Sequence, residues 1–317
     1  MAAGTAGSVS RWALLLAVPT AALGVSLAWQ LAAPAQPQPS SMVRVIADCM
    51  GALVLGLAAI GRLQTSGRRK VVSQQDLWRP MAIAAGVWTV AEIVLLAFEA
   101  SDVESSRVSD LGASQFLSFL THISSGQVGI AAVACTAGLV AYAAVAFRQN
   151  ANWSADPALV LSALALVIRP ITGHMSLQPF GALLGATHAL AAGLWFGLLA
   201  ALALLVRTRG GWAELLPRYS EWAWRFVLVL TVSGVVNAAV RIGAFGPLFD
   251  TAYGRVVLAK TVVLLLLVGL GWWWRRTWVG QAAAHRMDAD ESLRRAIIEV
   301  VAMAVVFGLA AALATTA

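Results

Sequence analysis

Two histidines flank the start of a strongly apolar segment, and imidazole is a side chain that binds metals or carries protons. His174 stands in a short stretch with Gly and Pro, so we expect it in a loop beside the thioether of Met175. His188 follows within the apolar segment, where helical spacing places it on one face with small residues, Gly181, Gly185 and Ala192. Small residues let neighbouring helices approach closely, so this face is expected to contact protein.

The composition identifies the environment of these histidines. Apolar residues make up 60% of the 317, charged residues 12%, and the mean hydropathy is +0.78. Soluble domains carry about 25% charged residues. Apolar runs of about 20 residues predict membrane-spanning helices. The fold class expected is therefore all-α, a polytopic helical bundle in one integral membrane domain, 1–317. The net charge of +7 concerns topology, and no nucleic-acid partner is expected.

Nine membrane spans are predicted from the apolar runs, near 12–31, 43–62, 80–99, 127–147, 157–171, 181–206, 223–242, 254–274 and 296–315. Basic residues of short connections favour the cytoplasm. The connections 62–79, 207–225 and 275–295 are basic, whereas 99–125 is acidic. This predicts an N-terminus inside and a C-terminus outside.

The first span has an alternative interpretation as a cleaved signal peptide, with Arg11 before the apolar run and Ala33-Pro34-Ala35 as the cleavage site. The long apolar run favours a retained helix.

Sulfur ligands occur near the outer end of the second span. Thioether and thiolate groups suit Cu(I), while imidazole accepts both copper states. Met42, Cys49 and Met50 are therefore weaker candidates, although packed sulfur is commoner. His122 ends an amphipathic stretch, 111–123, and a surface helix with an exposed histidine is the favoured interpretation.

Ionisable groups inside a membrane are costly and tend to mark sites or pathways. This favours a functional role for His188 over simple packing, whereas for His174 both interpretations stay open. Further polar residues fall in the outer half of the spans and predict a transport or structural network: Asp48, Glu92, Arg169, Asn237, Arg241 and Lys260. The partner of Glu92 is left open among Arg169, Arg241 and Lys260. On the inner side, a pair with Arg295 is the simplest account of Glu299.

Several motifs in the same order resemble the copper resistance D family of bacterial inner-membrane proteins. They are Thr172-Gly173-His174, then His188, Ala191, Trp195 and Gly197 in the spacing H-x-x-A-x-x-x-W-x-G, then 233–237, 251–255 and Lys260. The resemblance covers 112–317, which leaves 1–111 as an N-terminal three-helix part. It implies copper as the bound ion and a bacterial plasma membrane location. The sequence contains no phosphate loop, GxSxG, CxxC or HExxH motif, and no enzymatic activity is expected.

The function expected is copper import through an outer-face site of His188, His174 and Met175. Some relatives carry an extracytoplasmic copper-binding domain, so a copper chaperone acting in trans is an expected partner, and a homo-oligomer is left open. Two alternatives remain at this point: a redox protein that binds b-type haem, which needs two imidazoles from the bundle, or an accessory protein that delivers copper to a respiratory oxidase.

Overall fold

The computed structural model describes residues 10–34, 38–64, 70–172, 180–242 and 246–315, and within them it contains helices and no strands. The long helices are α1 (Ala17–Ala32, extending the 3-10 helix η1, Arg11–Leu16), α2 (Ser40–Ala59, continued by η2, Ile60–Leu63), α3 (Gln74–Val103), α5 (Ser124–Arg148), α6 (Asp156–Thr172), α7 (Gly181–Leu205), α8 (Arg209–Ile242), α10 (Ala252–Trp274) and α12 (Ala289–Thr315). The short ones are η3 (Val108–Asp110), α4 (Ala113–His122), α9 (Pro247–Asp250), the π-helix η5 (Arg275–Val279) and α11 (Gly280–Ala283).

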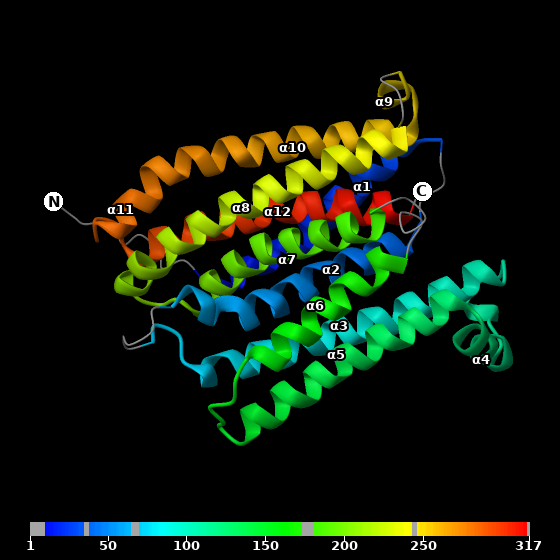
Figure 1. Cartoon of the computed structure of the whole chain (residues 1–317), viewed down its shortest axis with the longest axis horizontal. Helices are drawn as coiled ribbons and strands as arrows, with labels where there is room; N and C mark the ends of the chain where they lie inside the picture. Colours follow the sequence, from blue (N-terminus) through cyan, green and yellow to red (C-terminus); the bar gives the residue numbers. More distant parts are fainter. Residues whose placement is uncertain (1–9, 35–37, 65–69, 173–179, 243–245, 316–317) are drawn as a thin grey trace.

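The all-α bundle predicted from the sequence is confirmed (Figure 1). Eight helices in the described part of the chain are long and apolar enough to cross a membrane. The expected span at 157–171 corresponds to α6, whose 17 residues are about 25 Å long. The structure therefore places a helix at each of the nine expected spans, and α6 is the shortest when η1 is counted together with α1.

The predicted boundaries were too short at the polar ends of several spans. The connection 99–125 is largely helical, because α3 continues to Val103 and α4 and α5 follow. The connection 207–225 is mostly the beginning of α8, and η5 and α11 extend the helix of α10 into 275–295. Polar and basic residues can continue a helix beyond the bilayer, since its backbone bonds do not depend on apolar side chains.

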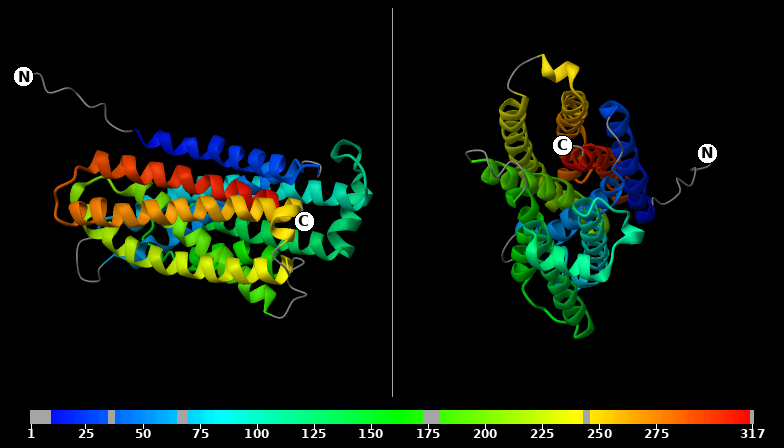
Figure 2. Two further views of the ribbon diagram at one scale, coloured as in Figure 1. Left: turned by 90° about the horizontal axis from the view of Figure 1, so that it is seen from above. Right: turned by 90° about the vertical axis from the view of Figure 1, so that its right-hand side faces the viewer.

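Two close helix contacts in the bundle, between α2 and α7 and between α1 and α12, depend on glycines. A Cβ at Gly197 of α7 would press on the backbone carbonyl of Ala52 in α2, and Gly56 contributes the matching surface. Gly24 of α1 and Gly308 of α12 meet in the same manner. Two thirds (67%) of the most apolar stretch of α2 is buried, against 11% in α8 and in α10. Hence α2 is central, and α8 and α10 are peripheral (Figure 2).

The bundle has two chemically different ends. Consecutive long helices alternate in direction, so the described parts of 62–79, 207–225 and 275–295 gather at one end, which we call the basic end. The opposite end carries α4 and α9, and we call it the α4 end (Figure 1). Helix η1 begins at the basic end and α12 finishes at the α4 end. The predicted direction of these ends across a membrane remains a prediction.

Candidate functional site

His188 lies in α7 and faces α8, at the α4 end of the bundle. Its Nδ1 is 2.8 Å from the hydroxyl oxygen of Ser233, which is buried. The Ser233 hydroxyl in turn donates to the backbone carbonyl of Val229 at 2.6 Å. We therefore assign the proton of the imidazole to Nδ1, from which it donates to Ser233. This tautomer leaves the lone pair on Nε2, which is the atom that can bind a metal.

Gly234 of α8 lies beside the imidazole of His188. A Cβ built at Gly234 would lie 3.7 Å from Cε1 of His188, which is an ordinary contact distance. Ser233 and Gly234 thus form the wall against which the ring rests.

Asn237 follows Ser233 by four residues on α8, a distance of about 6 Å along the helix axis. Its Oδ1 is buried and has no hydrogen-bond partner among the described residues. A buried amide oxygen without a partner is costly. Asn237 therefore offers an acceptor on the same face of α8 as Ser233.

Two charged groups lie at a similar depth to His188. His188, Asp48 and Lys260 stand 7, 8 and 8 residues from the first residues of α7, α2 and α10 (188 − 181, 48 − 40 and 260 − 252), or about 11–12 Å. The positive charge of Lys260 acts on His188, and the negative charge of Asp48 acts on Lys260. Asp48 itself forms an ion pair with Arg44 on its own helix, at 3.3 Å.

The buried carboxylate of Glu92 pairs with Arg169, one of the three partners that the sequence left open. The Nη2 and Nε atoms of Arg169 donate to one oxygen of Glu92 at 2.8 and 3.0 Å, and the indole of Trp88 donates to the other oxygen at 3.1 Å. Arg169 also pairs with Glu99. The guanidinium is thus held between two carboxylates of α3, which fixes α6 against α3.

The predicted polar network therefore divides into two parts. Arg44, Asp48, Glu92, Glu99 and Arg169 form ion pairs on α2, α3 and α6, whereas His188, Ser233, Asn237 and Lys260 lie on α7, α8 and α10. Sequence reasoning missed Arg44 and Glu99. The spacing of Arg44 and Asp48 at i and i+4 could have indicated the first pair, and Glu99 was assigned to a connection although α3 includes it.

The remaining residues singled out from the sequence do not join His188 in the described part of the structure. Met42, Cys49 and Met50 pack with the hydrophobic core, and Cys49 and Cys135 are free thiols. His122 is exposed at the end of α4, where its Nδ1 is 2.8 Å from the hydroxyl of Thr121, as the surface interpretation predicted. His174, Met175 and the side chain of Arg241 lie outside the described residues. Within the described ranges no three His, Cys, Asp or Glu side chains come together as a metal site.

The chain is similar to known copper resistance and copper transport proteins. A family model described as copper resistance protein D-like, N-terminal domain, matches residues 1–179, and a model described as copper resistance protein D matches residues 213–313. A curated relative from Bacillus subtilis (strain 168), the copper transport protein CutJ, is 30% identical over 135 residues. That alignment covers 39% of this chain and 24% of the relative, so the chain spans about a quarter of that protein. No solved structure matches the chain.

Proposed function

The chain belongs to the copper resistance protein D family of membrane proteins, and we propose that it transports copper, which it receives at the α4 end and passes toward the basic end. The observation that carries this proposal is the imidazole of His188, whose Nδ1 is held by Ser233 so that Nε2 can bind an ion. A hydrogen bond to the other ring nitrogen is the usual support of a metal-binding histidine.

Capture of copper is assigned to His174 and Met175, which precede α7 in the chain. Imidazole and thioether are ligands that copper prefers, so the pair suits an ion that arrives from outside the bundle. His188 would then accept the ion about two helical turns deeper. Asn237 supplies an acceptor oxygen one turn from Ser233 toward the α4 end.

The charge of Lys260 favours release of copper from His188, which a transport site requires and a storage site does not. Its positive charge acts on His188 and opposes a second cation there. Transport requires a site that binds its ion and then releases it. We infer that Lys260 weakens copper binding at His188 and that Asp48, whose charge acts on Lys260, limits this repulsion.

The direction proposed is import across the bacterial plasma membrane, because the basic connections favour a cytoplasmic location for the basic end. The contacts of α1 with α12 and of α2 with α7 support a single integral membrane domain that joins 1–111 and 112–317. A copper chaperone in trans on the outer side remains part of the proposal.

Haem binding is less well supported than copper handling. A b-type haem needs two imidazoles that face one another. Of the other described histidines, His122 is exposed in α4 and His285 follows α11 at the basic end, so neither is a partner for His188. His174 lies outside the described residues, and the family assignment supports copper as the ligand of the site.

The decisive experiment compares wild type with His188→Asn in two measurements, copper binding by the purified protein and copper uptake into proteoliposomes. Asparagine retains polarity and approximate size but is a much poorer copper ligand. We expect copper affinity to fall more than about 100-fold, since loss of a ligand itself should cost more than the 10–100-fold typical of its supporting residues.

The control is His285→Asn. His285 has a φ of 54°, a left-handed conformation that asparagine accepts, so its substitution leaves the fold and copper uptake unchanged. A folded His188→Asn variant that binds and transports copper as wild type does would refute the proposal.

A further inference from the structure

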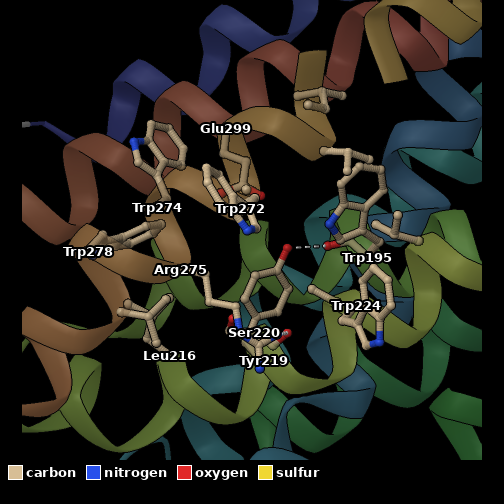
Figure 3. Close-up of a pocket in the computed structure, with 16 residues that line it drawn as sticks. Trp195, Leu216, Tyr219, Ser220, Trp224, Trp272, Trp274, Arg275, Trp278 and Glu299 are labelled. Carbon is tan, nitrogen blue, oxygen red and sulfur yellow. Dashed lines mark hydrogen bonds between the residues drawn. The ribbon is translucent and has the colours of Figure 1, made fainter. Parts of the chain in front are cut away.

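A pocket lies at the basic end of the bundle, away from His188. Its walls come from α7, α8, α10, η5 and α12, and its volume is about 160 Å³ (Figure 3). A single buried water needs roughly 10–15 Å³ of cavity volume when the volume is measured as the space open to the centre of a water-sized sphere. The pocket therefore holds a group considerably larger than a single water molecule. Indole rings of Trp195, Trp224 and Trp272 form much of the wall.

One carboxylate faces into this aromatic pocket. Glu299 of α12 is 7% exposed, and among the described residues it has neither a hydrogen bond nor an ion pair. The sequence predicted a pair with Arg295, but the structure contradicts this, because Arg295 donates to Glu291 at 2.9 Å. Burial favours the neutral form of this carboxyl group, and a cationic ligand in the pocket would stabilise the ionised form, for which the described residues provide no positive partner.

The Tyr219 hydroxyl lies on the other side of the same space (Figure 3). It donates its proton to the backbone carbonyl of Trp195 at 3.2 Å, so its oxygen can still accept. Glu299 and Tyr219 are close enough to interact electrostatically. The interior of the pocket therefore presents acceptors, and it calls for a group that is positively charged and donates hydrogen bonds.

The mouth of the pocket carries the opposite charge. Arg275, in the π-helix η5, is exposed there, and its single hydrogen bond to the Ser220 carbonyl is long, at 3.4 Å. Trp224 and Trp272 are exposed at the sides, between two helices that touch each other little, α8 and α10. The opening is therefore lateral, where a lipid would lie. Short π-helical turns such as η5 occur often at functional sites.

The depth of the pocket corresponds to the membrane interface. Glu299 lies four residues, about 6 Å, beyond Arg295, where the charged beginning of α12 gives way to apolar residues. Trp272 and Arg275 stand where α10 ends, a position typical of interfacial anchors. A phospholipid beside the bundle would thus have its headgroup near this level.

We propose that the pocket binds the headgroup of an ethanolamine phospholipid, with the primary ammonium at Glu299 and Tyr219 and the phosphate at Arg275. The order of charges fits such a lipid, because the phosphate lies nearer the acyl chains and the ammonium at the tip. The chains would lie along α8 and α10. An anionic lipid would bring no cation to Glu299. Indole faces add attraction for the ammonium. This site is independent of the copper route.

The test is lipid retention by the purified full chain, measured by native mass spectrometry. The protein is exchanged into equal mixtures of phosphatidylethanolamine, phosphatidylcholine and phosphatidylglycerol with identical acyl chains. We expect wild type to retain phosphatidylethanolamine preferentially and Glu299→Gln to lower that retention at least about tenfold, the effect of losing a charge-assisted hydrogen bond. Glu221→Gln, an exposed carboxylate on α8, is the matched control and should retain lipid as wild type does.

Equal retention of the three lipids by wild type, or unchanged retention by Glu299→Gln, would overturn the proposal. If Glu299→Gln yields no folded protein, Arg275→Gln decides the question, because Arg275 is exposed and its loss should weaken retention of phosphatidylethanolamine without affecting folding. Unchanged retention by that variant would likewise count against the site.

Discussion

His188 of α7 and Ser233 of α8 are joined by a hydrogen bond of 2.8 Å, while the serine hydroxyl donates to its own helix. The serine thereby fixes both the tautomer and the orientation of the ring. We expect Ser233→Ala to weaken copper binding by about 10- to 100-fold, as for other residues that support a metal ligand. Equilibrium copper titration of the purified protein measures this. Ser162→Ala, a buried serine that bonds only to its own helix, is the control and should bind copper normally.

Lys260 should have the opposite effect on affinity. Lys260→Met retains the length of the side chain and removes the charge that opposes a cation at His188. We expect copper to bind about tenfold more tightly, which corresponds to about 1.4 kcal/mol of repulsion removed, and to leave more slowly. Stopped-flow release into a chelator measures the rate. Lys70→Met, an exposed site at the basic end, should change neither quantity, and unaltered release from Lys260→Met would exclude the role given to Lys260.

The pair of Glu92 and Arg169 should matter mainly for stability. Glu92→Gln leaves the buried guanidinium of Arg169 with reduced compensation. Breaking a buried ion pair costs about 3–5 kcal/mol, so we expect a clearly lower melting temperature in detergent. Glu104→Gln, at an exposed carboxylate, should change the free energy of unfolding by no more than about 0.5 kcal/mol. Equal melting of the two variants would show that the pair contributes little.

The contact between α2 and α7 should not tolerate a methyl group. In Gly197→Ala the new Cβ would press on the Ala52 carbonyl and lie 3.1 Å from the backbone nitrogen of Gly56. Overpacking of this kind costs about 1–3 kcal/mol, and thermal melting detects it. At Gly86 no atom lies within 4 Å of a built Cβ, so Gly86→Ala should be neutral or slightly stabilising. A Gly197→Ala variant with wild-type melting would place the helices further apart than described.

The orientation of the bundle is tested with reporter fusions. A reporter that is active only in the cytoplasm should work when inserted at 62–79 or 275–295, and it should fail at 99–125 and at the C-terminus, because basic connections stay inside. Activity of the C-terminal fusion would reverse the proposed direction of transport and place His188 on the inner side.

Much of the fold followed from the sequence, because apolar runs of membrane length and the basic residues between them are local signals. The partner of Glu92 was not local: Arg169 lies 77 residues away, and three cations at similar depth satisfied the same pattern. Glu99 was missed since an acidic residue near a span end resembles a loop residue, yet α3 carries it into the bundle.

In the candidate site, too, local sequence signals predicted some features, whereas side-chain pairings were not predictable from them. The family motifs include His188 and 233–237, two segments that the structure joins through the hydrogen bond between His188 and Ser233, and the role of these residues in copper binding stays a prediction. The pairing of Asp48 with Arg44 of its own helix was overlooked in favour of contacts between helices. Glu299 was assigned to Arg295 by proximity in sequence, but Glu291 and Glu299 are both four residues from Arg295, and in the structure the Arg295 side chain donates to Glu291 while Glu299 lines an aromatic pocket.

The contact of Gly24 with Gly308 has a consequence for biogenesis. Helix α1 leaves the ribosome first among the described spans, yet its principal partner, α12, is the last of them to be made. Until then the backbone surface around Gly24, which Val305 and Gly308 cover in the complete bundle, is without these neighbours. Closure of the bundle therefore follows the synthesis of α12, and a truncation that removes α12 should leave α1 exposed to quality-control proteases.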